Sequence, residues 1–77
     1  MIPITLADVG EDVVIRKITG KDEVRLHLAE MGLVVGEPIT IISKLGENLI
    51  LKVKESRIAI GHGLTSRIQI EPCPGST

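Results

Sequence analysis

Residues 48–60, NLILKVKESRIAI, hold two short runs in which apolar and polar side chains alternate. In the first run Leu49, Leu51 and Val53 lie on one face of an extended chain. Alternation with a period of two is typical of a β-strand with one buried face. The sequence therefore predicts two neighbouring strands, and residues 55–56 are the expected tight connection between them.

Segments on either side of this pair have the same character. Residues 39–43 are rich in β-branched side chains, and residues 12–18 carry apolar side chains on both faces, as expected of a strand whose two ends are covered differently. A turn is expected at residues 45–48, since Gly and Asn tolerate positive φ. In total we expect five strands, at residues 12–18, 39–43, 48–54, 57–60 and 67–71.

Residues 22–31 change to a helical period. Val24, Leu28 and Met31 are spaced as i, i+4 and i+7, which places them on one stripe of a helix. A helix of three turns is marginal alone, so we expect it to dock against the strands. The chain is therefore predicted to be mainly β, a small, partly open barrel of about five strands with one short α-helix in a connection.

Both ends of this helix carry sequence signals. Asp22 is the expected N-cap, and Glu23 adds negative charge to the first turn. Gly32 stands where a helix commonly ends with a left-handed residue. Leu33 is then placed to make the apolar contact that seals such an end.

The length of 77 residues allows one domain, which we place at residues 1–72, with a loose tail at 73–77. Cys73 is the single cysteine, so no internal disulfide forms. No stretch has the pattern of a secretory signal or the apolar length of a membrane span. We therefore expect a cytoplasmic protein that reaches a membrane only through a partner.

Two features of the composition argue against nucleic-acid binding. The chain contains no Phe, Trp or Tyr, so it cannot stack bases on aromatic rings. Its 9 Lys and Arg against 10 Asp and Glu give a net charge of −1, whereas proteins that follow a phosphate backbone carry a basic excess.

The outer face of the predicted helix carries Leu26, roughly opposite the apolar stripe. One interpretation is a solitary exposed leucine, which is common on protein surfaces. The other is an anchor for a partner, because apolar side chains rimmed by charge resemble interface hot spots. Neighbouring apolar residues after the helix extend this surface. The candidate partner interface consists of Arg25, Leu26, Ala29, Glu30, Leu33, Val34 and Val35.

No pattern of catalytic or metal-binding residues is present. The serines lie in no nucleophile motif, and Gly61-His62-Gly63 lacks the Lys-Ser/Thr of a phosphate loop, so we expect a turn between strands. The soft ligands His27, His62 and Cys73 are scattered and form no spaced motif. The sequence predicts neither an enzyme nor a cofactor, and leaves open only a divalent ion held weakly at the surface or between chains.

Basic side chains are frequent late in the chain, at outward strand positions. We interpret them as a solvated face that discourages edge-to-edge strand pairing. The alternative is an electrostatic patch for an acidic partner. These residues are Lys44, Lys52, Lys54, Arg57 and Arg67.

The segment from Leu28 to Ile39, LAEMGLVVGEPI, resembles the signature of the FeoA family. That signature is a helix ending in Leu-x-x-Leu/Met-Gly-Leu, followed by x-x-Gly and a β-strand. The resemblance extends over residues 4–72, including the entry at Leu6 and the strand ending at Glu71.

The resemblance implies an SH3-like barrel with a helical insertion. It also implies a small cytosolic accessory protein of bacterial ferrous-iron uptake, whose partner is FeoB, a membrane transporter with a cytosolic GTP-binding domain. The same fold resembles the C-terminal domain of diphtheria-toxin-repressor-type metal regulators. A metal-responsive domain that itself binds a transition-metal ion is therefore the alternative function.

This sequence departs from the family pattern in two places. The family's helix often carries consecutive basic residues where this chain has Arg25, Leu26 and His27. If the family's helix docks through basic charge, we expect apolar contacts to make up a larger part of the docking surface of this protein. Relatives tend to have a short charged helical turn near residues 61–63, where the glycines predict a looser loop here.

Overall fold

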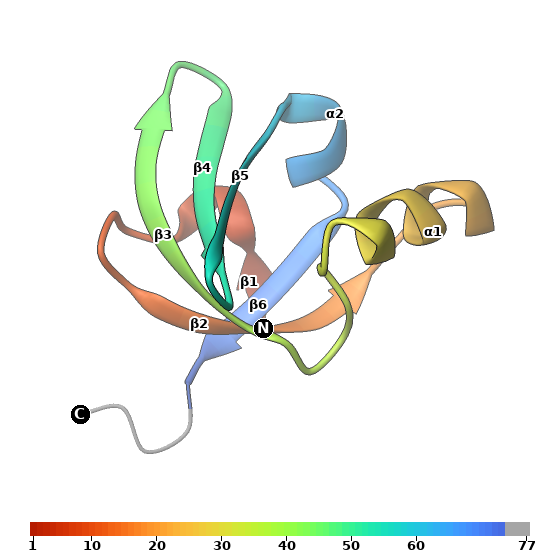
Figure 1. Ribbon diagram of the computed structural model, residues 1–77, viewed down its shortest axis with the longest axis horizontal. Coiled ribbons are helices and arrows are strands. Elements are labelled where there is room, and N and C mark those ends of the chain that lie inside the picture. The colour runs from red at the N-terminus through yellow and green to blue at the C-terminus, as the bar shows by residue number, and fades with distance from the viewer. Residues whose placement is uncertain (74–77) are drawn as a thin grey trace.

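Six antiparallel strands form one curled sheet in the computed structural model, which describes residues 1–73 (Figure 1). The order across the sheet is β1-β6-β2-β3-β4-β5. Figure 1 shows the sheet folding back so that β3, β4 and β5 stand over β2 and β6. The strands are β1 (Ile2–Pro3), β2 (Asp12–Ile18), β3 (Pro38–Leu45), β4 (Asn48–Val53), β5 (Ser56–Ile60) and β6 (Ile68–Pro72).

Three helical segments occupy the connections. The 3-10 turn η1 (Ile4–Leu6) follows β1, α1 (Asp22–Glu30) joins β2 to β3, and α2 (His62–Thr65) joins β5 to β6. The prediction of a mainly β domain with one short helix in a connection is confirmed. The strand β1 was not predicted, because two residues are too few to show a period.

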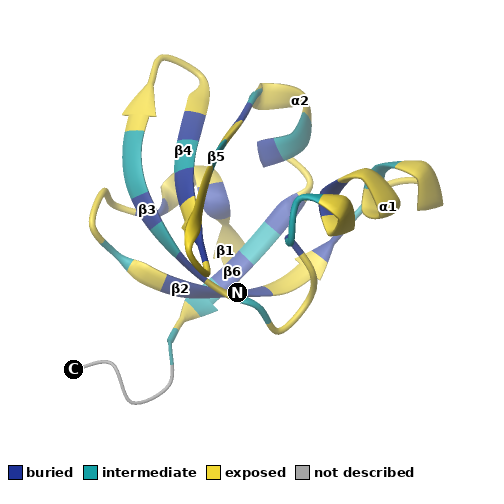
Figure 2. Ribbon diagram, viewed as in Figure 1, coloured by how far each residue is buried: buried dark blue, intermediate teal, exposed yellow. Residues whose placement is uncertain are grey.

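The core lies between the folded halves of the sheet, and Figure 2 shows buried residues alternating with more exposed ones along several strands. Leu49, Leu51 and Val53 are buried as their alternation predicts. Leu28, in the middle of the apolar stripe of α1, is buried in the core. Val24 and Met31, at the two ends of the stripe, are partly buried and pack against the core. Helix α1 is thus held by packing, as a short helix must be.

Two β-bulges interrupt the period of two. The pairing of β2 with β6 shifts between Ile15 and Lys17, and that of β3 with β4 shifts between Ile41 and Ser43. A bulge adds one unpaired residue and moves the following side chains to the other face. This is why Ile15 and Ile18, three apart in one strand, are both buried.

The C-terminal end of α1 is closed by two backbone hydrogen bonds. The Leu33 amide donates to the Leu28 carbonyl at 2.9 Å, and the Gly32 amide donates to the Ala29 carbonyl at 2.9 Å. Gly32 has φ +90°, so this is the predicted left-handed helix end. The predicted N-cap is wrong by one residue. Lys21 is the extended N-cap and Asp22 is the first helical residue, where its charge still favours the helix dipole.

The two hairpins differ in how well the sequence located them. The turn at residues 45–48 is confirmed, with Gly46 at φ +62°. The next turn lies at Lys54 and Glu55, one residue earlier than predicted, because Val53 pairs with Ser56. Lys54 adopts φ +56° without the usual Asn or Gly, so no residue type marks the position of this turn.

Residues 61–63 do not form the loose turn that their glycines predict. They enter α2, in which the Thr65 amide donates to the Gly61 carbonyl at 3.0 Å. The buried Thr65 hydroxyl donates to the His62 carbonyl at 3.2 Å, and Leu64 packs against the core. Tertiary packing therefore overrides the low helix propensity of Gly63.

The substitution Gly63→Ala is expected to raise the free energy of unfolding by about 0.5–1 kcal/mol, since alanine loses less backbone entropy in a helix. A Cβ atom at this position meets no atom within 4 Å. Urea denaturation of the two proteins measures the change. A lower midpoint for the alanine variant would contradict the helical assignment of this segment.

Candidate partner-binding groove

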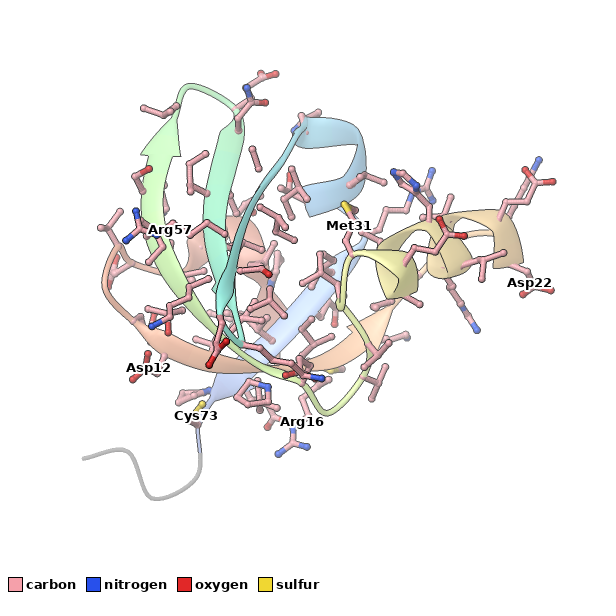
Figure 3. All side chains as sticks on the ribbon, viewed as in Figure 1. Asp12, Arg16, Asp22, Met31, Arg57 and Cys73 are labelled. Atoms are coloured by element: carbon pink, nitrogen blue, oxygen red, sulfur yellow. The ribbon has the colours of Figure 1, made fainter. Side chains whose placement is uncertain are left out.

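A groove of about 350 Å³ lies between α1, β2 and the segment that follows α1. In Figure 3, α1 extends away from the barrel, with Asp22 at its far end and Met31 pointing back toward the barrel. The groove is formed on one flank of this helix. It is lined by Arg16, Lys17, Ile18, Arg25, Ala29, Leu33, Val34 and Val35.

The interior of the groove is apolar. Of its lining residues, Ile18 and Leu33 belong to the core, while Val34 and Val35 are 41% and 61% exposed. Ala29 adds an exposed methyl group from the helix. Desolvating such a surface on binding is favourable in proportion to the apolar area covered.

Leu33 was predicted to belong to the exposed partner interface, but the structure buries it. Its side chain is 0% exposed, because its amide closes the end of α1 and this geometry turns the side chain into the core. A partner in the groove would therefore rest over Leu33 without depending on an exposed leucine there. The two valines that follow supply the accessible apolar surface instead.

Three cationic side chains line the same groove. Arg16 Nε lies 2.8 Å from Glu71 Oε1, so this cation is already paired. Among residues 1–73, no carboxylate oxygen lies within 4 Å of the charged groups of Lys17 or Arg25. Two unpaired positive charges therefore stand beside apolar surface.

The groove brings together Arg25, Ala29, Leu33, Val34 and Val35 from the predicted interface. Leu26 lies outside the lining but on the adjacent outer surface of α1, where it is 62% exposed. It is three residues from Ala29, a spacing that makes them neighbours on a helix surface. Glu30 is exposed and falls further around the helix axis, away from the groove.

Sequence reasoning missed Arg16, Lys17 and Ile18. Their positions follow from the bulge in β2, which places two consecutive charged residues at the surface before Ile18 turns inward. The signal was the spacing of three between Ile15 and Ile18 inside a strand, since a regular strand buries residues two or four apart.

The predicted soft ligands lie on separate elements. His27 is on α1, His62 is on α2 and Cys73 follows β6. Within residues 1–73, no three side chains of His, Cys, Asp or Glu come together in the manner of a metal site.

The late basic residues do not form one patch. Lys52 and Arg57 face each other across β4 and β5, whereas Lys44 Nζ donates to the Thr5 carbonyl at 3.3 Å. The side chain of Arg67 lies beside Gly20, within 3.1 Å of the position a Cβ would take there. This arrangement agrees with the interpretation of a solvated surface better than with a patch for one partner.

None of the helices in residues 1–73 is both long and apolar enough to cross a lipid bilayer. The described part of the chain is a small SH3-like barrel with an apolar groove beside its inserted helix. A family model described as FeoA domain matches residues 2–72. The chain belongs to the FeoA domain family, as the motif at its helix end predicted.

Relatives agree with this assignment. A protein of Methanocaldococcus jannaschii, named "Putative Fe(2+) transport protein A", is 34% identical over 71 residues, which cover 92% of this chain and 87% of the relative. A crystal structure of an iron uptake regulatory protein, FeoA, has a TM-score of 0.84 at 29% identity, covering 94% of this chain and 96% of that one.

The fold also occurs within larger proteins. A crystal structure of ScaR with bound Cd²⁺ has a TM-score of 0.84 at 18% identity. The match covers 92% of this chain but 35% of that one. At this identity the likeness concerns the fold alone.

Proposed function

We propose that this protein is a non-enzymatic accessory protein of ferrous-iron uptake that binds the cytosolic GTPase part of an FeoB-type membrane transporter. Family membership and the names of its relatives support the link to iron transport. The observation that carries the binding role is the apolar groove beside α1, continued outward by Leu26. Exposed aliphatic side chains around a concave surface are typical of protein docking sites.

Binding by itself does not regulate a transporter. An accessory protein alters the partner's activity only if it has different affinities for two conformations of that partner. The rigid barrel suits this role, because α1 is fixed by core packing and can select one arrangement of the opposing surface. Nucleotide exchange in the GTPase domain is the partner's natural source of two such conformations.

The substitution Leu26→Asp tests the docking surface. It is expected to weaken binding to the purified GTPase domain about tenfold or more, since it replaces an apolar contact with a charge that must be desolvated. The fold is expected to persist, because Leu26 is 62% exposed. Isothermal titration calorimetry with each nucleotide state measures the affinity.

The matched control is Leu45→Asp, which places the same charge at a leucine that is 61% exposed on the distant β3–β4 hairpin. It is expected to bind as the wild-type protein does. Equal weakening by both variants would show that a negative charge at either leucine weakens binding, and that Leu26 has no special part in it. No heat of binding from the wild-type protein in any nucleotide state would overturn the proposed partner.

A further inference from the structure

We propose that the groove between α1 and β2 takes an acidic segment of the partner protein, which inserts an aliphatic side chain between its carboxylates. This inference rests on the proposed function as a docking protein and names the chemistry of the bound segment. It follows from the combination of an apolar interior with positive charge on both walls, from Arg16 and Lys17 on β2 and from Arg25 on α1.

The charge distribution is the first argument. The whole chain carries −1, yet the groove is lined by Arg16, Lys17 and Arg25 and by no acidic side chain. Only Arg16 is in an ion pair within residues 1–73. A carboxylate that approached Lys17 or Arg25 would gain a partner without breaking an existing ion pair.

The position of the acidic residues on α1 is the second argument. At 100° per residue, Glu23 and Glu30 lie about 120° or more around the helix axis from the flank of Arg25 and Ala29. Asp22, one turn before Arg25, makes no ion pair with it in the described structure. Asp22 lies on the same side of the helix as Ala29, but it is the first residue of α1 and does not line the groove, whereas Arg25 does.

The shape of the groove is the third argument. A volume of about 350 Å³ is at the small end of binding sites, enough for a few side chains of an inserted segment. Nucleic acid requires a longer run of phosphate contacts than the three cations of one small groove provide. The apolar surface of Val34, Val35 and Ala29 would gain nothing from a phosphate backbone, whereas it suits a leucine or isoleucine side chain.

Peptide selection on the full chain tests this inference without the transporter. A display library of random dodecapeptides is selected on the wild-type protein at low salt, and the enriched peptides are titrated by fluorescence polarisation. We expect them to carry net negative charge around at least one aliphatic residue. The double variant Lys17→Glu/Arg25→Glu is expected to bind them about tenfold or more weakly, because attraction becomes repulsion at two positions.

The matched control is the double variant Lys52→Glu/Arg57→Glu, which makes the same change of net charge on the outer face of β4 and β5. It is expected to bind the peptides within about twofold of the wild-type protein, since exposed charges far from a site are screened. Equal loss in both double variants would overturn the inference, as would enrichment of neutral or basic peptides, or no enrichment. Binding of an oligonucleotide or of anionic vesicles in place of peptides, lost in Lys17→Glu/Arg25→Glu, would also overturn it.

The result is separable from the proposed partner. If the GTPase domain binds in a Leu26-dependent manner but tolerates Lys17→Glu/Arg25→Glu, the acidic segment is wrong and the docking function stands. If acidic peptides bind as expected while the GTPase domain does not bind at all, the groove chemistry is right and the proposed partner is wrong.

Discussion

The substitution Leu33→Ala is expected to lower the free energy of unfolding by about 2–4 kcal/mol, because it removes a fully buried side chain and leaves a cavity that the rigid surroundings fill only in part. Leu33 is 0% exposed and joins the end of α1 to the core. In a domain of this size, such a loss is a large part of the total stability. Urea denaturation monitored by far-ultraviolet circular dichroism measures it.

Val35→Ala is the control for this prediction, since Val35 lies two residues further along the same segment and is 61% exposed. Its effect on stability is expected to be within about 0.5 kcal/mol. The sequence alone placed Leu33 in the partner interface. A Leu33→Ala variant as stable as Val35→Ala, with weakened partner binding, would restore that interpretation and contradict the structure.

The substitution Gly32→Ala is expected to lower the free energy of unfolding by about 1–3 kcal/mol. Gly32 has φ +90°, a conformation that side chains disfavour, and its added Cβ would lie 3.2 Å from Val53 Cγ1. Both effects strain the junction where α1 meets β4. Because Val34 and Val35 follow Leu33 in the same segment, the variant is also expected to bind the partner more weakly.

Gly36→Ala separates the two causes. Gly36 has φ +94°, but a Cβ there meets no atom within 4 Å, so its variant measures the backbone cost alone. Chemical denaturation of both variants is expected to show the larger loss for Gly32→Ala, and the difference is the cost of crowding Val53. Equal losses would mean that the helix end moves freely enough to avoid that contact.

The main elements could be predicted because local pattern and tertiary environment agree in them. The alternation of Leu49, Leu51 and Val53 turns one face of their strand inward, whichever strands it pairs with. In the same way, the apolar stripe that contains Leu28 turns one side of α1 toward the core. The helix end at Met31-Gly32-Leu33 was also predictable, since a left-handed closing residue is usually glycine.

Other features depend on contacts between distant segments, which a local pattern does not encode. The bulge beside Arg16 is set by pairing with β6, and α2 forms because Leu64 and Thr65 are buried against the barrel. The helix propensity of Gly63 points the other way and is overridden.

Only the α1 side of the candidate groove could be predicted, because the groove is formed between segments that are distant in the sequence. Arg25, Ala29, Val34 and Val35 follow from the helix period and its continuation along the chain. The opposite wall comes from β2, and nothing local to residues 16–18 shows that this strand passes beside α1. Leu33 was predicted both to seal the helix end and to belong to the partner interface, and its burial agrees with the first role, since only the packed structure shows which way its side chain faces.

The groove beside α1 is the surface by which we propose that this protein binds the GTPase domain. Amide chemical-shift mapping of the isotope-labelled full chain, titrated with that domain, tests it most directly. The shifts are expected to concentrate at residues 16–18, 25–29 and 33–35. Shifts centred on the β3–β4 hairpin or on the outer face of β4 and β5, with the groove unchanged, would contradict it.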